Sequence, residues 1–208
     1  MIRRLISTKK LIDINFYLRG GNDMEILITN RLKLRQWEEN DSAELYEYAK
    51  SELVGPNAGW PPHKNEEESK EIIKMFIADN DTYAIVLKSE NKVIGSIGIH
   101  DRKPDLTLSK LNQKEIGYVL NPRYWGNGFI PEAVDCLIKY GFNELNLDLI
   151  WCGHFDFNHN SKRVIEKCGF NYKFQKKGIV KLLDNKEVTT LYYSIFKSEY
   201  YNRLPITK

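Results

Sequence analysis

The chain has 208 residues, of which 42% are hydrophobic and 28% charged, as is usual for a globular domain. Its formal net charge is +3 at pH 7, and residues 1–24 alone hold the same excess, with five Lys and Arg against two Asp. The remaining body is neutral and has no basic stripe, which argues against nucleic acid as the main partner, because phosphate neutralisation needs clustered Lys and Arg.

Hydropathy and cysteine usage indicate the cellular compartment of the protein. No run approaches the roughly 18 apolar residues of a membrane span, and the N-terminal residues lack the pattern of a signal peptide. We therefore expect a cytoplasmic protein without a membrane partner. Cys136, Cys152 and Cys168 form no CxxC pair, so we expect buried free thiols and neither a disulfide framework nor a metal site.

Residues 1–23 are expected to form an appendage to a single domain. They end in Gly-Gly-Asn-Asp, a sequence that breaks regular structure, and the pattern that follows Met24 is self-contained. The domain boundaries that we predict are therefore 1–23 for the appendage and 24–208 for the folded domain.

The first half of the domain alternates between strand and helix patterns. The helix at 40–53 has Asp41 as its N-cap and Glu44 three residues later, which predicts a capping box. In chain order we expect a strand at 26–37, the helix at 40–53, a loop at 54–65, a helix at 66–80, and a hairpin of strands 82–89 and 92–101 around Glu90 and Asn91.

The second half continues this alternation. We expect a strand at 114–121, a helix at 129–145, a strand at 149–157, a helix at 160–168 ended by Gly169, and strands at 173–183 and 186–196 around Asp184 and Asn185. The order predicts a mixed α/β (α+β) fold with one largely antiparallel sheet flanked by helices.

The stretch that joins strand 114–121 to the next helix carries an Arg-x-x-Gly-x-Gly pattern. Gly126 and Gly128 lack Cβ atoms, so a ligand can approach the backbone, and the helix start offers unpaired N–H groups with partial positive charge. Arg123 can add a charge-assisted contact. The pattern predicts a site for an anion such as a diphosphate, and a glycine-rich connection without a ligand is the alternative of equal weight.

A second motif, NHNSKRVIEKCGF at residues 158–170, follows about 30 residues later. With EIGY at 115–118 and YWGNGFIPEA at 124–133, in this order, it resembles the GNAT superfamily of acetyl-CoA-dependent N-acetyltransferases, and within it the RimJ/RimL-like branch. The resemblance covers roughly residues 25–200. It implies the GNAT fold, in which the central strand splays from its neighbour after a bulge, with acetyl-CoA as co-substrate and no metal.

The resemblance also implies which residues hold the cofactor. The backbone of Tyr118, Val119 and Leu120 would lie along the pantetheine arm. Asn158 would bond the same arm through its amide, a role compatible with that of a helix N-cap. The diphosphate would lie on Arg123, Tyr124, Trp125, Gly126, Asn127, Gly128 and Phe129.

Acetyl transfer to an amine requires an unprotonated amine, an oxyanion donor and a proton for the departing thiolate. Glu115 on the splayed strand is the preferred base, because burial can raise its pKa into a useful range, and the backbone N–H of Val119 is the expected oxyanion donor. Ser161 is the preferred acid, since the resemblance places it near the sulfur. The alternatives that stay open are His100, His154 and Glu166 for the base, and Tyr172, Tyr192 and Tyr193 for the acid.

The acceptor is less well marked than the cofactor. Trp60 and His63, in the loop 54–65, are expected to form one wall of its site, and a loop anchored by burial of Trp60 is the alternative. We expect a primary amine, either a protein N-terminal α-amine, as in the ribosomal-protein acetyltransferases of this branch, or a small molecule. A non-catalytic acyl-CoA-binding module is the alternative function, and both a monomer and a homodimer fit the sequence.

The proposed domain boundary leads to a first prediction. Deletion of residues 1–23 should leave both the melting temperature and the binding of acetyl-CoA unchanged, because the motifs and the element pattern begin after them. Thermal melts of the full chain and the truncated chain, with and without acetyl-CoA, test this. Loss of soluble, cofactor-binding protein on truncation would show that the segment belongs to the fold.

Overall fold

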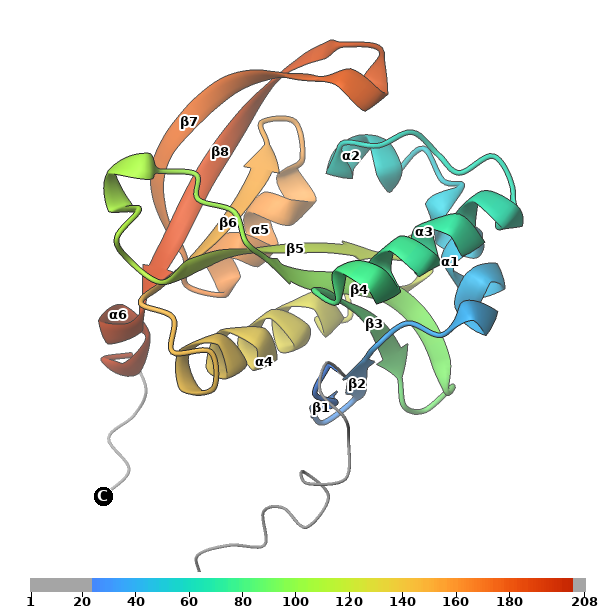
Figure 1. Cartoon of the computed structure of the whole chain (residues 1–208), viewed down its shortest axis with the longest axis horizontal. Coiled ribbons are helices and arrows are strands. Elements are labelled where there is room, and N and C mark those ends of the chain that lie inside the picture. Colours follow the sequence, from blue (N-terminus) through green and yellow to red (C-terminus); the bar gives the residue numbers. More distant parts are fainter. Residues whose placement is uncertain (1–23, 204–208) are drawn as a thin grey trace, which may run out of the picture.

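The computed structural model of the chain describes residues 24–203, which form one sheet with helices on both faces (Figure 1). The appendage expected at 1–23 lies outside the described residues. Within 24–203, no helix is both long enough and apolar enough to cross a membrane.

Eight strands of the described chain form the sheet, in the order β1-β2-β3-β4-β5-β6-β8-β7. Neighbouring strands are antiparallel except β5 and β6, which run parallel, so the predicted largely antiparallel sheet is confirmed. The strands are β1 (Leu27–Ile28), β2 (Leu32–Arg35), β3 (Thr82–Leu87), β4 (Lys92–His100), β5 (Gln113–Leu120), β6 (Leu149–Phe155), β7 (Asn171–Val180) and β8 (Lys186–Phe196).

The helices lie close to their predicted places, with two unpredicted short additions, α2 and α6. They are α1 (Ser42–Ala49), α2 (Gly55–Ala58), α3 (Glu66–Asp79), α4 (Phe129–Asn143), α5 (His159–Lys167) and α6 (Lys197–Tyr201). Single 3-10 turns are η2 (Glu39–Asp41), η3 (Leu106–Leu108), η4 (Pro122–Tyr124) and η5 (Lys181–Leu183).

Each face of the sheet has its own hydrophobic cluster, because successive side chains of a strand point to opposite faces. Tyr83 and Ile85 of β3 pack in the cluster that contains the apolar side of α4. Ala84 and Val86, which alternate with them, pack against α1 and α3 on the other face. Figure 1 shows α4 below the sheet and α3 with α1 on the other side.

The parallel strands β5 and β6 part in the middle of the sheet. They are paired only from Gln113 with Leu149 to Ile116 with Cys152. Beyond this point β5 stays paired with β4 and β6 with β8, and the ends of β5 and β6 diverge (Figure 1). The splay that the family resemblance implies is therefore present.

The bulge expected before the splay is not on the splayed strand. The pairing of β5 with β4 is regular from His100–Glu115 to Gly95–Leu120. A register shift occurs instead between β3 and β4, at Ile85 and Val86. The strands therefore separate because β6 turns away with β8, and β5 needs no extra residue.

Two local predictions near the start of the domain were wrong. The expected strand at 26–37 is divided into β1 and β2, which pair with each other around a turn at Thr29. The capping box of Asp41 and Glu44 does not form, because Glu44 accepts the N–H of Val93 at 2.9 Å. The carboxylate of Asp41 is bound by both terminal nitrogens of Arg35, at 2.7 and 2.8 Å. Asp41 also accepts the N–H of Glu38 at 2.9 Å, which completes a capping box of the 3-10 turn η2, and only Glu44 has exchanged its local role for a tertiary contact.

This ion pair gives a second prediction. Asp41→Asn should lower the free energy of unfolding by about 3 kcal/mol, because it leaves the largely buried guanidinium of Arg35 without its counter-charge. Glu38→Gln is the matched control, since Glu38 lies 3.5 Å from the same guanidinium but is exposed, and it should cost less than about 1 kcal/mol. Urea unfolding of both variants measures the difference; equal costs would contradict the structural role of Asp41.

Candidate acetyl-transfer site

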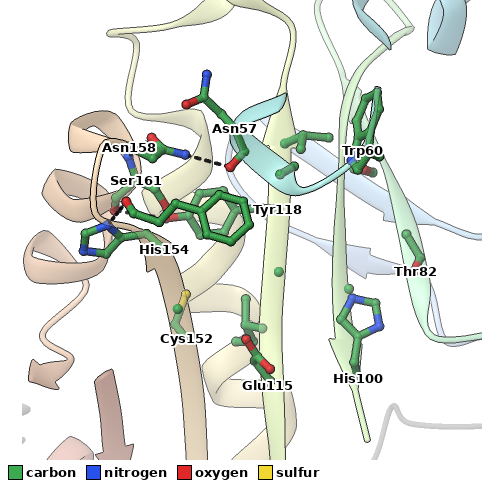
Figure 2. Close-up of a pocket in the computed structure, with 18 of the residues that line it drawn as sticks. Asn57, Trp60, Thr82, His100, Glu115, Tyr118, Cys152, His154, Asn158 and Ser161 are labelled. Atoms are coloured by element: carbon green, nitrogen blue, oxygen red, sulfur yellow. Dashed lines mark hydrogen bonds between the residues drawn. The ribbon is translucent and has the colours of Figure 1, made fainter. Parts of the chain in front are cut away.

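A cavity of about 540 Å³ opens where β5 and β6 part. It extends from the edge of α5 across the face of the sheet to α1, α2 and α3. Figure 2 shows residues of α5 and β6 on one side and residues of β4 and the α2 loop on the other. The predicted site residues that line it are Trp60, His63, Glu115, Tyr118, Val119, Asn158 and Ser161.

The glycine turn follows β5 directly. Gly126 and Gly128 both have positive φ angles, 80° and 76°, which glycine adopts without strain. A Cβ added to Gly126 would meet no atom within 4 Å, so the space beside it is open. Gly128 is the N-cap of α4, whose first N–H groups have no partner within the helix. The turn therefore has the form of an anion site, and its backbone geometry is a second reason for the glycines.

Arg123 lies at this turn with its side chain 77% exposed. Its Nη1 is 3.1 Å from Oε1 of Glu47 on α1, and the side-chain amide of Asn121 donates to the same oxygen at 3.0 Å. Lys92 donates to the other oxygen of Glu47 at 2.6 Å, and this bond, with that of Asn121, holds the pKa of Glu47 below its usual range. Arg123 is thus held by a charged carboxylate while most of it stays open to an anion.

A second arginine, Arg31, which the sequence analysis missed, forms hydrogen bonds with the turn and with the first part of α4. Arg31 donates to the carbonyl of Asn127 at 2.9 Å and to Oε2 of Glu132 at 2.7 Å, and its guanidinium lies 4.5 Å above the ring of Phe129. Glu132 also accepts the hydroxyl of Thr29 at 2.5 Å. The turn between β1 and β2 therefore fixes the start of α4.

The two aromatic residues of the turn are held by the sheet. The hydroxyl of Tyr124 donates to Glu90 at 2.5 Å, and the indole N–H of Trp125 donates to the carbonyl of Leu120 at 2.9 Å. Leu120 does not line the cavity, and its carbonyl is engaged by this indole. The carbonyl of Leu120 is thus hydrogen-bonded within the chain, and the assignment of the Leu120 backbone to a bound arm stays a prediction.

Strand alternation decides which backbone groups of β5 face the splay. The N–H of Asn121 donates to Ile94 of β4, whereas the carbonyl of Asn112 accepts from the chain just before β6, both at 2.8 Å. Because backbone groups alternate along a strand, odd-numbered residues of β5 point toward β4 and even-numbered ones toward β6. The N–H of Val119 therefore faces β4, and the expectation that it is the oxyanion donor was wrong. The N–H of Tyr118 faces the splay.

Ser161 meets the side chain of Tyr118, whose role the sequence analysis had limited to its backbone. The two hydroxyl oxygens are 2.9 Å apart, and the phenol also donates to the carbonyl of Ser161 at 3.2 Å (Figure 2). Burial raises the pKa of the Tyr118 phenol well above its usual value, so it stays protonated as a donor. The Ser161 hydroxyl can then donate toward the cavity.

Asn158 was considered both as the N-cap of a helix and as a residue that bonds the pantetheine arm. Its Oδ1 accepts the N–H of Ser161 at 3.0 Å, which makes it the N-cap of α5. Its side-chain amide donates to the carbonyl of Asn57 on α2 at 3.2 Å (Figure 2). This contact joins the α5 side of the cavity to the α2 side, and no sequence pattern indicated it.

Glu115 lies on β5 one residue before the last pair with β6, on the face of the sheet opposite to Tyr118. Burial raises the pKa of its carboxyl, while the positive charges of Arg102 and His100 oppose the rise. His100 is its partner on β4, and Nδ1 of His100 lies 2.6 Å from Oδ2 of Asp81. A carboxylate and an Asp-bound imidazole therefore lie side by side at the cavity wall.

The other candidates for acid and base differ in access. His154 has both ring nitrogens engaged, with the carbonyl of Phe155 at 2.7 Å and the hydroxyl of Tyr193 at 3.3 Å, and burial lowers its pKa. Glu166 lies outside the cavity lining, beside Lys162 on α5. Of the three tyrosines considered, Tyr192 lines the cavity and Tyr172 and Tyr193 do not.

Trp60 and His63 lie where the sequence predicted a wall. Their rings are 5.1 Å apart, and Nδ1 of His63 is 2.8 Å from the hydroxyl of Ser69 at the start of α3. Burial lowers the pKa of His63, so the ring is uncharged near neutral pH. Ile72 and Phe76 of α3 extend the same wall, which is largely apolar.

The three cysteines are free thiols, and Cys152 lines the cavity. Cys152 is buried and Cys136 and Cys168 are partly buried, all as free thiols, and burial raises their pKa values. Among residues 24–203, no group of three or more His, Cys, Asp and Glu side chains is arranged to hold a metal ion.

Comparison with known proteins agrees with this geometry. Residues 31–171 match the family model of the acetyltransferase (GNAT) domain. The uncharacterized N-acetyltransferase YnaD of Bacillus subtilis is 31% identical over 84% of this chain and 98% of its own length. The putative ribosomal N-acetyltransferase YdaF of the same organism is 26% identical over 85% of each chain.

A solved structure shows the same architecture. The GNAT-family acetyltransferase from Bacillus anthracis superposes with a TM-score of 0.74 at 26% identity, over 84% of this chain and all of that one. GNAT acetyltransferases use acetyl-CoA, and the splay, the glycine turn and the start of α5 are where the motifs placed them. The chain therefore belongs to the GNAT family of N-acetyltransferases.

Proposed function

We propose that this protein transfers the acetyl group of acetyl-CoA to a primary amine, by direct attack while both substrates are bound. The observation that carries the proposal is the cavity at the parting of β5 and β6, which has the partly buried carboxylate of Glu115 at its wall. The glycine turn that follows β5 is not part of the cavity lining, and we assign the anionic end of the cofactor to it. When bound, acetyl-CoA supplies an activated acetyl group and a thiol leaving group. The chain supplies binding, orientation and proton transfer.

The cofactor side is formed by the splay, the turn and α5. The backbone of Tyr118 faces the splay and can pair with a peptide-like arm, with Val119 beside it at the cavity wall. Asn158 offers its amide at the other edge of the splay. The diphosphate is assigned to the exposed guanidinium of Arg123 and the turn residues Tyr124, Trp125, Gly126, Asn127, Gly128 and Phe129.

The catalytic roles follow from position and protonation. Glu115, with its raised pKa, takes a proton from the attacking nitrogen. The N–H of Tyr118 lies at the splay to stabilise the carbonyl oxygen. Ser161, held by the phenol of Tyr118, donates a proton to the departing sulfur.

The acceptor site lies on the side of α1, α2 and α3. Trp60, His63 and Phe76 give it an aromatic wall, which suits an amine that carries an apolar group. The name of YdaF favours a ribosomal protein N-terminus, whereas the aromatic wall favours a small molecule. Turnover of an amine panel, followed by release of CoA, separates these acceptors and also distinguishes an enzyme from an acyl-CoA-binding module.

A third prediction tests the cofactor. Acetyl-CoA at about 100 times its dissociation constant should stabilise the fold by about 2.7 kcal/mol, and a thermal melt measures the shift. Gly126→Val should lower the stability of the free protein, because its φ is positive, and should also abolish the shift.

Gly178→Val, on the β7–β8 hairpin, is the matched control and should keep the full shift, because a Cβ there also meets nothing within 4 Å and its φ is not positive. A wild-type melt unmoved by millimolar acetyl-CoA would remove the cofactor assignment.

A fourth prediction tests the base and the acid. Glu115→Gln should lower turnover by about 10²- to 10⁴-fold with little change in acetyl-CoA affinity. Only the ionised carboxylate of Glu115 can act as the base, and burial raises its pKa. As the pH is lowered, the wild-type rate should therefore begin to fall at a pH higher than that at which ordinary carboxyl groups titrate. The Glu115→Gln variant should not show this fall.

Ser161→Ala should cost less than Glu115→Gln, because a thiolate leaves moderately well without help. Rates against pH measure both effects. A Glu115→Gln variant of near wild-type activity would exclude that base.

A further inference from the structure

Beside Glu115, His100 at the end of β4 is paired with Asp81, which lies just before β3, and the roles above do not use this pair. Nδ1 of His100 is 2.6 Å from Oδ2 of Asp81, and Oδ1 of Asp81 accepts the hydroxyl of Thr82 at 2.8 Å. The backbone carbonyl of Asp81 accepts the N–H of Ile99 at 2.9 Å. Asp81 is therefore fixed at both oxygens and holds the imidazole in one orientation.

The opposite edge of the ring points to the place where β5 and β6 part. The imidazole occupies the space above Gly98, where a Cβ would overlap it, and Nε2 is 3.5 Å from the position of a Cβ on Gly117. Gly117 directly follows Ile116, the last residue of β5 that pairs with β6. Figure 2 shows His100 and Glu115 side by side on adjacent strands. Because Gly98 and Gly117 have no side chains, Nε2 of His100 is open to the cavity where β5 and β6 part.

We propose that His100 is a second catalytic residue, the base that takes the first proton from the acceptor's ammonium group, and that Asp81 is its positioning residue. This inference rests on the proposed function, since it assigns a step of amine acetylation. When Nδ1–H is donated to Asp81, Nε2 keeps its lone pair and can accept a proton. The arrangement matches the division of work in which a carboxylate fixes the tautomer of a histidine base.

Two bases fit the proton balance of the reaction. A protonated amine loses one proton to Nε2 of His100, and the lone pair that this leaves on nitrogen forms the C–N bond as the C–S bond of the thioester breaks. Nitrogen gives its second proton to Glu115, and sulfur takes a proton from Ser161. Glu115 and Ser161 are reset by exchange with solvent and His100 releases its proton there, so one proton is set free per turnover.

The charges around His100 are consistent with this step. Asp81 faces the ring from just before β3, and Glu115 is the partner of His100 on β5. The positive charge of Arg102, in the segment after β4, acts on Glu115 and on Tyr192 of β8. Two carboxylates therefore balance the guanidinium and the incoming ammonium group. The apolar wall of Trp60 and Phe76 is left for the rest of the acceptor.

The test compares an amine that needs deprotonation with one that does not. Benzylamine is protonated at pH 7, whereas benzhydrazide has a neutral terminal nitrogen and the same phenyl group. His100→Gln should lower kcat/KM for benzylamine by about 10²-fold or more and for benzhydrazide by less than about threefold. Asp81→Asn should show the same selectivity with a smaller loss, whereas Glu115→Gln should impair both acceptors.

Controls separate this role from a structural one. His159→Gln, on the exposed start of α5, should leave both rates unchanged, and the acetyl-CoA melt shift should survive in every variant. Free imidazole should restore part of the benzylamine rate of His100→Ala. Equal losses with both acceptors, or none with benzylamine, would overturn the proposal.

A measurement without turnover covers the case in which the wild-type protein acetylates neither probe, an outcome that counts against the proposed small-amine acceptor alone. In ¹⁵N NMR of histidine-labelled protein, neutral His100 should carry its proton on Nδ1 and none on Nε2, and Asp81→Asn should abolish this preference. A proton found on Nε2 in the neutral wild-type ring would overturn the assignment of His100 as base.

Discussion

The separation of β5 from β6 is the constraint on which the rest of the site depends. A sheet that opens in its middle leaves backbone N–H and C=O groups without a strand partner, and such groups must be satisfied or remain in contact with solvent. Here the opening begins after Ile116 and Cys152, within a sheet whose outer parts stay fully paired. In the proposed complex, a peptide-like ligand arm supplies the missing partner. The glycine turn follows the end of one separated strand, and α5 follows the end of the other.

Much of this arrangement was predictable from sequence, because it is encoded locally. Strand alternation, helix periodicity and turn residues fixed most elements to within a few positions, and Asp184 and Asn185 adopt the positive φ angles that a tight turn requires. The Arg-x-x-Gly-x-Gly pattern predicted the turn before α4 and the Asn158 motif predicted the start of α5, because their glycines and cap residues act through backbone geometry. Trp60 and His63 were predicted to form a wall only because they lie in the loop between two helices, and both line the cavity.

The rest depends on contacts between segments far apart in the sequence. Glu44 was expected to form a capping box with Asp41, and it accepts the N–H of Val93 on β4 instead. The pair of Asp81 and His100 did leave a signal, since the two residues lie equally far from the hairpin turn at Glu90 and Asn91, but pairing them requires the register of the strands. The direction of the Val119 N–H likewise follows from pairing on both sides of β5, which no single-strand pattern contains.

The contact between Asn158 and α2 has a consequence for how acceptor preference can change over evolution. Asn158 bonds the backbone carbonyl of Asn57 and not its side chain, so the link across the cavity does not depend on which residue occupies position 57. The wall around Trp60 can therefore acquire different side chains while its attachment to the cofactor side persists. If the proposed acceptor site is correct, divergence toward new amines can be confined to the segment 54–65 and α3, without compensating change in α4 or α5.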